Sequence, residues 1–238
     1  MDVRMVDAGE VRLACRVSGN PDGAAVVLLH GLGKSGADWD AVAGELGRHR
    51  RVYAPDLRGH GDSDRPGRYS FELMRDDLGA MLKALELERV SLVGHSMGGV
   101  VAYLYASEHP ERVERLVLED VPPPVARERA VPERPDGVPG FDWDVVAPLH
   151  AQLADPAEDW QAGLDAITAP ALLLGGGLRS HVPQDQIAAM ARRLSRGCLV
   201  TIPCGHEIHA ARPMEFAATL DGFLPGGAPG PATGGHGV

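Results

Sequence analysis

The chain has 238 residues, of which 44% are hydrophobic and 24% are charged, and its formal net charge at pH 7 is −10. This length and apolar content fit one domain with a large core, and acidic charge that is spread without long runs argues against a nucleic-acid-binding surface. No apolar stretch is long enough to span a bilayer and residues 1–5 lack the apolar core of a signal peptide, so we expect a cytoplasmic protein with no membrane partner.

Strand-like and helix-like patterns alternate along the chain. Short apolar runs predict strands, and apolar residues that recur every three or four positions predict helices. In chain order, the patterns predict strands at 11–17 and 25–30, a helix at 37–46, a strand at 51–54, a helix at 71–87, a strand at 90–93, a helix at 97–108, strands at 113–119 and 171–175, a helix at 183–194, a strand at 199–202 and a helix at 214–223. This alternation predicts an α/β fold in which helices cover both faces of a mostly parallel central sheet.

Two segments interrupt the alternation. Residues 122–168 contain many prolines among short helical patches, so they do not supply a regular strand and are predicted to form a lid over the sheet. Three aromatic residues of this insertion are candidates either for pocket walls or for anchors of the lid to the core: Phe141, Trp143 and Trp160. Residues 225–238 are mostly Gly, Pro and Ala, which predicts a flexible tail after a single domain at 1–224.

The most informative motif is Gly94-His95-Ser96-Met97-Gly98, which connects the predicted strand at 90–93 to the predicted helix at 97–108. A strand, a sharp turn and a helix in this order hold a serine in a strained elbow, where its Oγ is exposed at the top of a sheet. The two glycines leave room for the turn. An ordinary tight turn would explain these five residues, but it would not explain the predicted strand before them and the predicted helix after them. Ser96 is therefore the candidate nucleophile.

Three further segments accompany this motif: the turn His30-Gly31-Leu32-Gly33, the stretch from Asp56 to Ser63, and the pair Gly205-His206. In this combination the chain resembles the α/β-hydrolase superfamily over about residues 10–224, and within it the small serine esterases, lipases and lactonases. The resemblance implies an α/β-hydrolase fold with a short lid. It also implies a nucleophile, an acid and a base in the chain order Ser, acid, His.

The resemblance places the base on the loop after the last strand, where His206 follows Gly205. A serine hydroxyl is a weak nucleophile at neutral pH, and such a base takes its proton during attack. His209 is the alternative base, with a surface or lid-contacting position as its other interpretation. His30 and His60 are expected to be structural, because the resemblance assigns His30 to support of the oxyanion turn and the glycines around His60 indicate tight packing.

An oxyanion that forms at a substrate carbonyl needs preorganised N–H donors, each worth roughly a hundred- to a thousandfold in rate. The motif predicts one such donor at the backbone amide of Met97, the residue after the nucleophile. The resemblance implies a second donor at the backbone amide of Leu32. Because both groups belong to the backbone, the side chains at these positions say little about the prediction.

The position of the acid departs from the commonest pattern of the superfamily. Most members carry a carboxylate after the strand that corresponds to 171–175, but Arg179 occupies that position here. Asp185 comes two residues too late, at the start of a predicted helix, where capping or the helix dipole explains an acidic residue. Another carboxylate must therefore orient His206, or the triad is degenerate.

A better candidate for the acid follows the strand after the elbow helix, where the chain has Glu119 and Asp120. Some members of the superfamily, including haloalkane dehalogenases and certain small esterases, carry the acid at this place. Adjacent side chains of a strand point to opposite sides, so only one of the two should reach His206. Asp120 is preferred because Asp-Val-Pro-Pro approximates the esterase pattern. The alternative to a catalytic role is that both carboxylates are simply solvated at the end of a strand.

Together these residues predict a serine hydrolase that cleaves a carboxylic ester, thioester or lactone through an acyl-enzyme intermediate. The catalytic residues are predicted to be Ser96, His206 and Asp120, with an oxyanion hole formed at Leu32 and Met97. No metal or organic cofactor is expected, and the spacing of the cysteines indicates free thiols: Cys15, Cys198 and Cys204. The alternatives are a perhydrolase or acyltransferase with the same triad, and a non-catalytic ligand-binding homologue. Substrate identity and oligomeric state do not follow from the sequence.

Overall fold

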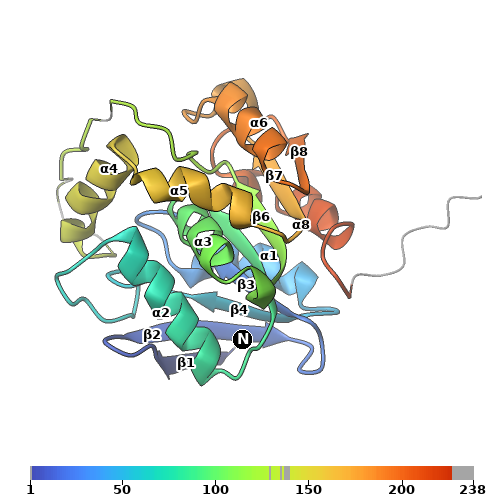
Figure 1. Ribbon diagram of the computed structural model, residues 1–238. Coiled ribbons are helices and arrows are strands. Elements are labelled where there is room, and N and C mark those ends of the chain that lie inside the picture. The colour runs from blue at the N-terminus through green and yellow to red at the C-terminus, as the bar shows by residue number, and fades with distance from the viewer. Residues whose placement is uncertain (1, 129, 135, 137–139, 227–238) are drawn as a thin grey trace, which may run out of the picture.

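The computed structural model describes residues 2–128, 130–134, 136 and 140–226. Within these residues, an eight-stranded sheet has the strand order β1-β2-β4-β3-β5-β6-β7-β8 (Figure 1). The strands are β1 (Asp2–Asp7), β2 (Arg12–Gly19), β3 (Ala25–Leu29), β4 (Arg51–Pro55), β5 (Val90–His95), β6 (Val113–Glu119), β7 (Ala171–Gly175) and β8 (Gly197–Thr201). β2 pairs antiparallel with β1 and with β4, and the other neighbours pair in parallel. The predicted α/β fold with a mostly parallel sheet is confirmed.

Apolar side chains alternate between the two faces of the sheet. Along β3, Val27 and Leu29 belong to the larger core cluster, whereas Val26 and Leu28 belong to a second cluster on the opposite face. Strands β5 and β7 are buried throughout, as expected of parallel strands that are covered on both sides. Burial of each such aliphatic side chain contributes roughly 1.5–3 kcal/mol, so these two layers are a main source of stability.

Helices cover both faces of the sheet. They are α1 (Asp40–Leu46), α2 (Phe71–Ala84), α3 (Met97–Glu108), α4 (Val146–Ala154), α5 (Glu158–Gly163), α6 (Gln184–Arg193), α7 (Ile208–Ala211) and α8 (Pro213–Asp221). Helices α2 and α3 pack together on one face, and α1 and α8 pack together on the other (Figure 1). Ser70 caps the N-terminus of α2, and its Oγ accepts a hydrogen bond from the amide of Leu73 at 3.1 Å.

Most predicted elements are present, and their ends account for the main differences. The predicted helix at 97–108 and the predicted strands at 113–119 and 171–175 match the observed bounds. Helix α2 ends earlier than predicted because Glu86 has a φ of 55°, outside the helical region. Strand β1 is missing from the sequence prediction, since its residues are mostly exposed on the sheet edge and only Val6 among them is buried.

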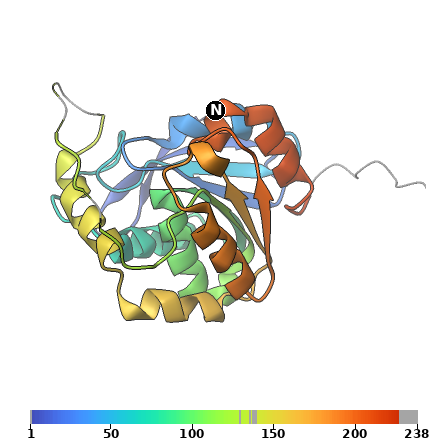
Figure 2. The same cartoon turned by 90° about the horizontal axis from the view of Figure 1, so that it is seen from above.

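The insertion between β6 and β7 is packed onto the domain as helices. Seen from above, α4 lies at the left edge of the molecule and α5 along its lower edge (Figure 2). Their buried side chains, among them Leu149 and Trp160, join the larger core cluster. Phe141, which precedes α4, forms an isolated antiparallel bridge with His60. The insertion is thus held by contacts at several points along its described length.

The C-terminal segment continues beyond α8 and is anchored at its start. Of the predicted tail at 225–238, residues 227–238 lie outside the described part of the chain. The carbonyl oxygen of Pro225 accepts a hydrogen bond from Nε of the buried Arg50 at 2.8 Å. The chain is therefore fixed at least as far as this residue.

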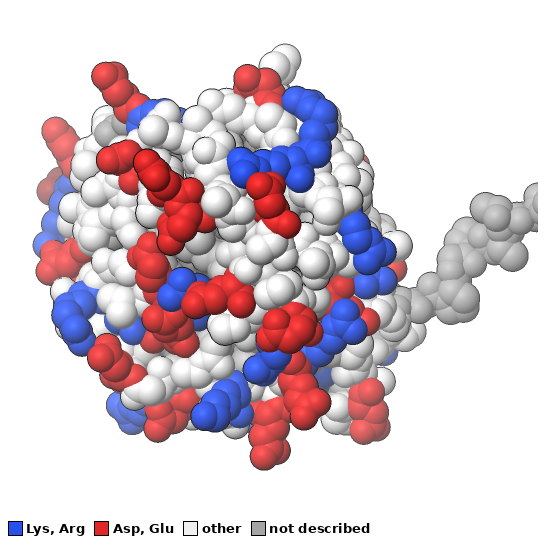
Figure 3. Space-filling view, viewed as in Figure 1, with Lys and Arg blue, Asp and Glu red and all other residues white. Residues whose placement is uncertain are grey.

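The surface carries charged side chains of both signs, which are interspersed over the face seen in Figure 3. None of the described helices combines the length and the apolar character that crossing a membrane requires. The three cysteines are free thiols, in agreement with the sequence prediction.

Candidate active site

Ser96 lies in the sharp turn between β5 and α3. Its backbone has a φ of 49° and a ψ of −114°, which is strained for a residue with a side chain. A Cβ atom on Gly94 would lie 2.5 Å from the carbonyl oxygen of Gly98, and one on Gly98 would lie 2.3 Å from that of Leu29. Only glycine therefore fits at these two positions, and the elbow predicted from the motif is present in the structure.

Asp120 and His206 form a hydrogen-bonded pair beside this elbow. Asp120 follows β6 with a φ of 47°, and its side chain is fully buried. Its Oδ2 atom lies 2.7 Å from Nδ1 of His206, which follows Gly205 on the loop after β8. Because an ionised carboxylate only accepts hydrogen bonds, Nδ1 carries the proton and Nε2 is left as the basic nitrogen of the ring.

The loop after β7 and the first residue of α6 supply donors to the Asp120 carboxylate. Oδ1 accepts hydrogen bonds from the amide of Gly176 at 2.9 Å and from Nε2 of Gln184 at 3.0 Å, and Oδ2 accepts one from Oγ of Ser180. Burial alone would raise the pKa of Asp120, but the hydrogen bonds from His206 and from these three groups outweigh burial and lower the pKa. The buried carboxylate is thus ionised at neutral pH.

The other acid candidates lie elsewhere. Arg179 ends a short 3-10 helix, Gly177–Arg179, in the loop after β7, and Asp185 is exposed in the first turn of α6. Glu119 is fully buried, and its carboxylate bonds His209 and not His206. Glu119 and Asp120 therefore reach different histidines, as the opposite directions of adjacent side chains predict.

His209 is buried in α7, so the expectation of a surface or lid-contacting position is wrong. Its Nδ1 atom lies 2.8 Å from Oε2 of Glu119, and its Nε2 atom lies 3.0 Å from Oδ2 of Asp38. Its ring packs on that of Trp39, with centroids 4.1 Å apart. Nothing in the sequence marks this cluster, because its members lie up to 171 positions apart.

His30 holds the turn that follows β3. Its Nδ1 atom donates to the carbonyl oxygen of Gly31 at 2.8 Å, and its Nε2 atom accepts from the amide of Leu57 at 2.9 Å. Burial lowers the pKa of His30 to about 4, so the ring is neutral. The ring of His60 packs against it, with centroids 5.0 Å apart, and burial lowers the pKa of His60 to about 3. Both rings have the packing that a structural role requires.

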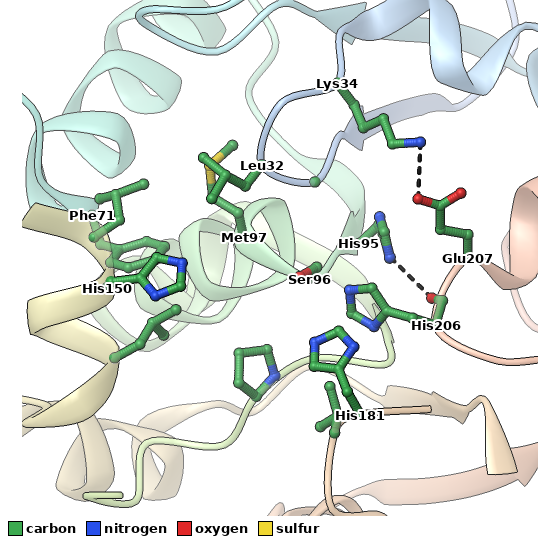
Figure 4. A pocket seen from close by; sticks show the side chains of 15 residues that line it. Leu32, Lys34, Phe71, His95, Ser96, Met97, His150, His181, His206 and Glu207 are labelled. Carbon is green, nitrogen blue, oxygen red and sulfur yellow. Dashed lines mark hydrogen bonds and ion pairs between the residues drawn. The ribbon is translucent and has the colours of Figure 1, made fainter. Parts of the chain in front are cut away.

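A cavity of about 230 Å³ opens beside Ser96 (Figure 4). His206 and the two predicted oxyanion residues, Leu32 and Met97, also line it. Met97 is the first residue of α3, so its amide has no acceptor within that helix. The apolar part of the wall comes from α2, α4 and the loops after β6 and β7: Phe71, Pro122, Leu149, Leu153 and Val182.

Two polar contacts at this cavity are absent from the sequence analysis. Nζ of Lys34 lies 2.8 Å from Oε1 of Glu207, and Nε2 of His95 donates to the carbonyl oxygen of His206 at 3.0 Å (Figure 4). Burial lowers the pKa of His95 to about 4, so this ring is neutral and donates through one nitrogen. Both contacts tie the loop of His206 to the other side of the site.

The three aromatic residues of the insertion do not line this cavity. Phe141 and Trp143 pack against each other, with ring centroids 5.7 Å apart. Trp160 is buried edge-on against Phe71 at 5.4 Å, and its Nε1 atom donates to Oε1 of Glu72 at 3.1 Å. Of the two roles considered for these aromatics, the structure therefore supports anchoring of the insertion, and pocket walls are the wrong alternative.

One group of side chains in the described residues has the composition of a metal site. Its members are Asp38, His95 and His209, whose ligand atoms lie within 4.8 Å of one another. Both ring nitrogens of His209 already bond carboxylates. The group is explained as a buried hydrogen-bond network, and we assign no metal or cofactor to it.

Comparisons with known proteins agree with this architecture. A family model described as the alpha/beta hydrolase fold matches residues 24–153. An uncharacterized protein of Mycobacterium tuberculosis is 42% identical over 108 residues, which cover 45% of this chain and 31% of that protein. This chain thus spans about a third of the length of that relative.

Two further similarities extend over nearly the whole chain. Fluoroacetate dehalogenase of Burkholderia sp. is 30% identical, and the alignment covers 93% of each protein. Among solved structures, an esterase of a marine microorganism has a TM-score of 0.71 at 25% identity over 89% of this chain and 99% of that one. Since the family model matches more than half of the chain and a full-length relative agrees with it, the protein belongs to the α/β-hydrolase fold family.

Proposed function

We propose that the protein is a serine hydrolase that cleaves a carboxylic ester, thioester or lactone through an acyl-enzyme. One observation carries the proposal: Asp120 is buried and ionised, it accepts a hydrogen bond from His206 at 2.7 Å, and His206 lines the same cavity as the strained Ser96. The esterase among the similar structures supports an ester as the substrate class.

The chemistry begins with attack of Ser96 Oγ on the substrate carbonyl carbon, while Nε2 of His206 takes the hydroxyl proton. The amides of Leu32 and Met97 stabilise the oxyanion that forms. His206 then gives its proton to the leaving alcohol or thiol as the bond to that group breaks. Water repeats the sequence on the acyl-enzyme, with His206 again as the base, and the acid product leaves.

Asp120 acts on the histidine and not on the substrate. Its hydrogen bond keeps the proton on Nδ1 of His206, so Nε2 is available as a base, and its charge stabilises the imidazolium that forms during attack. The donors on the loop after β7 and at the start of α6 keep the carboxylate ionised and in place. These steps require no metal ion and no organic cofactor.

The insertion at 122–168 supplies the roof of the substrate pocket in this proposal. Pro122, Leu149, His150 and Leu153 line the cavity from the insertion, and Phe71 closes it from α2. Four of these five residues line the cavity beside the candidate nucleophile with apolar surface, so the pocket suits the acyl group of a small-molecule substrate.

A fluorophosphonate probe tests the proposal directly. We expect covalent labelling at Ser96, no labelling of Ser96→Ala, and unchanged labelling of Ser107→Ala, which alters a serine at the far end of the same helix. Absence of labelling in the folded wild-type protein would mean a ligand-binding homologue. Product analysis with water, peroxide and an alcohol as competing acceptors then separates a hydrolase from a perhydrolase or an acyltransferase.

A further inference from the structure

A second imidazole, that of His209, follows His206 three residues further along the chain. His209 is 1% exposed, and its backbone amide donates to Oε1 of Glu119 at 2.8 Å. Its ring bonds Oε2 of Glu119 through Nδ1 at 2.8 Å and Oδ2 of Asp38 through Nε2 at 3.0 Å. Carboxylates accept and do not donate when ionised, so both ring nitrogens carry protons. His209 is therefore a buried imidazolium between two carboxylates.

The three members of this network come from the three parts of the chain that form the candidate active site. Asp38 lies in the 3-10 helix Gly36–Trp39, just after the turn that carries Leu32. Glu119 ends β6 and directly precedes Asp120. His209 is the second residue of α7, which follows the loop of His206. One buried cation thus connects the oxyanion turn, the acid and the base.

His95 completes the connection to the elbow. Its ring lies between the two histidines, with centroids 4.6 Å from His206 and 5.0 Å from His209. Its Nε2 atom donates to the backbone carbonyl oxygen of His206, and the next residue along the chain is Ser96. A shift of His209 would therefore be transmitted through His95 to the backbone of the base.

We propose that His209 is a positioning residue whose positive charge holds the His206 loop and the oxyanion turn in register with Ser96. The proposal rests on the proposed function. Removal of the cation would leave Glu119 and Asp38 without their counter-charge, and such carboxylates reorient or take up protons or water. A displacement of about 1 Å in reacting groups lowers rates by about a hundredfold, so turnover is expected to fall although no group that touches substrate is removed.

The network also has a defined pH range. Burial alone would lower the pKa of His209, but the hydrogen bonds and charges of the two carboxylates outweigh burial and raise the pKa to about 9. The imidazolium therefore persists at neutral pH and is lost above about pH 9. The titratable and charged groups that face it from neighbouring elements are Glu119, Asp38, His95 and, through Asp38, Lys34.

The variant His209→Gln tests the proposal by replacing the cation with a neutral side chain. We expect kcat for a small aryl ester to fall by about ten- to a hundredfold at neutral pH, KM to change little, and the decrease of kcat above about pH 9 to disappear. His49→Gln, at an exposed histidine, is the matched control and should keep the wild-type kcat and pH profile. A double variant with Glu119→Gln should be no slower than the slower single variant, because the two residues act together.

Several outcomes would overturn the proposal. A folded His209→Gln variant with wild-type kcat and pH profile would do so, as would one that is only less stable to heat. If His209→Gln does not fold, Asp38→Asn changes the half-buried end of the same network and must show the same loss of kcat. Nitrogen NMR of the wild-type ring is independent of activity. Protonation of both nitrogens at neutral pH is expected, and a neutral His209 would refute the network even if no ester is hydrolysed.

Discussion

Ser96 and His206 act as one unit in the proposed mechanism, because the hydroxyl attacks only as its proton leaves. We expect Ser96→Ala and His206→Ala each to lower kcat by roughly a thousandfold to a millionfold, and the double variant to be hardly slower than either. Steady-state kinetics on an activated ester measures this. Losses that multiply in the double variant would contradict the pairing.

Asp120 is the residue on which the site departs most from the commonest pattern of its family. Asp120→Asn should keep the fold and lower kcat by up to about ten-thousandfold, because an amide favours the wrong tautomer of His206. Ser180→Ala removes one of several donors to the carboxylate and should lower kcat far less. Full activity of Asp120→Asn at neutral pH would show that His206 works without this acid.

The stability that His209 provides depends on pH in a direction set by its pKa. The folded-state pKa of about 9 lies above the ordinary value of 6.5, so the contribution is complete below about pH 6.5 and is lost as the pH rises through about 9. We expect the difference in unfolding free energy between wild type and His209→Gln to shrink over that range. Urea denaturation at several pH values measures it, and a difference that stays constant would argue against a charged ring.

The sequence identifies the members of the site to different degrees, for physical reasons. Ser96 lies in a local motif whose glycines enforce the turn, so it is visible in five residues. The choice of Asp120 over Glu119 follows from the alternation of side chains along a strand. Ser180 and Gln184 could not be predicted as its donors, because only the folded chain brings the loop after β7 and the start of α6 to that carboxylate.

At the scale of elements, α4 supplies most of the side chains with which the insertion reaches the cavity. Leu153→Ala should enlarge the pocket and raise the preference for an octanoyl over a butanoyl aryl ester by about tenfold, since one or two methylenes in an apolar pocket change affinity by about 1–3 kcal/mol. The ratio of the two kcat/KM values measures this. Leu199→Ala, at an exposed leucine of β8, is the control. Equal effects on both esters would exclude α4 from the acyl pocket.

Buried elements are predictable from the sequence and exposed ones are not. The bounds of α3, β6 and β7 follow from the pattern of apolar residues, because both faces of the sheet are covered. Strand β1 escapes prediction, since it is stabilised by the hydrogen bonds of its antiparallel pairing with β2 and leaves Val3 and Met5 about half exposed. The aromatic anchors of the insertion are of the same residue types as those that line pockets, so only their packing in the structure distinguishes the two roles.

At the scale of the whole molecule, Arg50 fixes the C-terminal end of the domain. This buried guanidinium pairs with Asp221 and donates to the carbonyl oxygens of Leu224 and Pro225. Deletion of residues 224–238 removes both carbonyl partners and the buried side chain of Leu224, and it should lower the unfolding free energy by about 3–5 kcal/mol because two hydrogen bonds and a core leucine are lost together. Deletion of 227–238 is the matched control, and its composition predicts almost no change. Chemical denaturation that shows equal losses would mean that Arg50 is not the anchor.

Two members of the candidate triad follow neighbouring strands: Ser96 follows β5 and Asp120 follows β6. His95 lies opposite Glu119 in the parallel register, and the amide of Ser96 donates to the carbonyl oxygen of Glu119 at 3.1 Å. Ser96 and Asp120 are therefore mounted on one rigid frame, the backbone ladder of two central strands. His206 alone is mounted on a separate loop. Relative motion within the candidate triad therefore reduces to movement of the His206 loop against this rigid frame. The fraction of time that His206 is aligned with Ser96 is set by the contacts of its loop and not by the sheet.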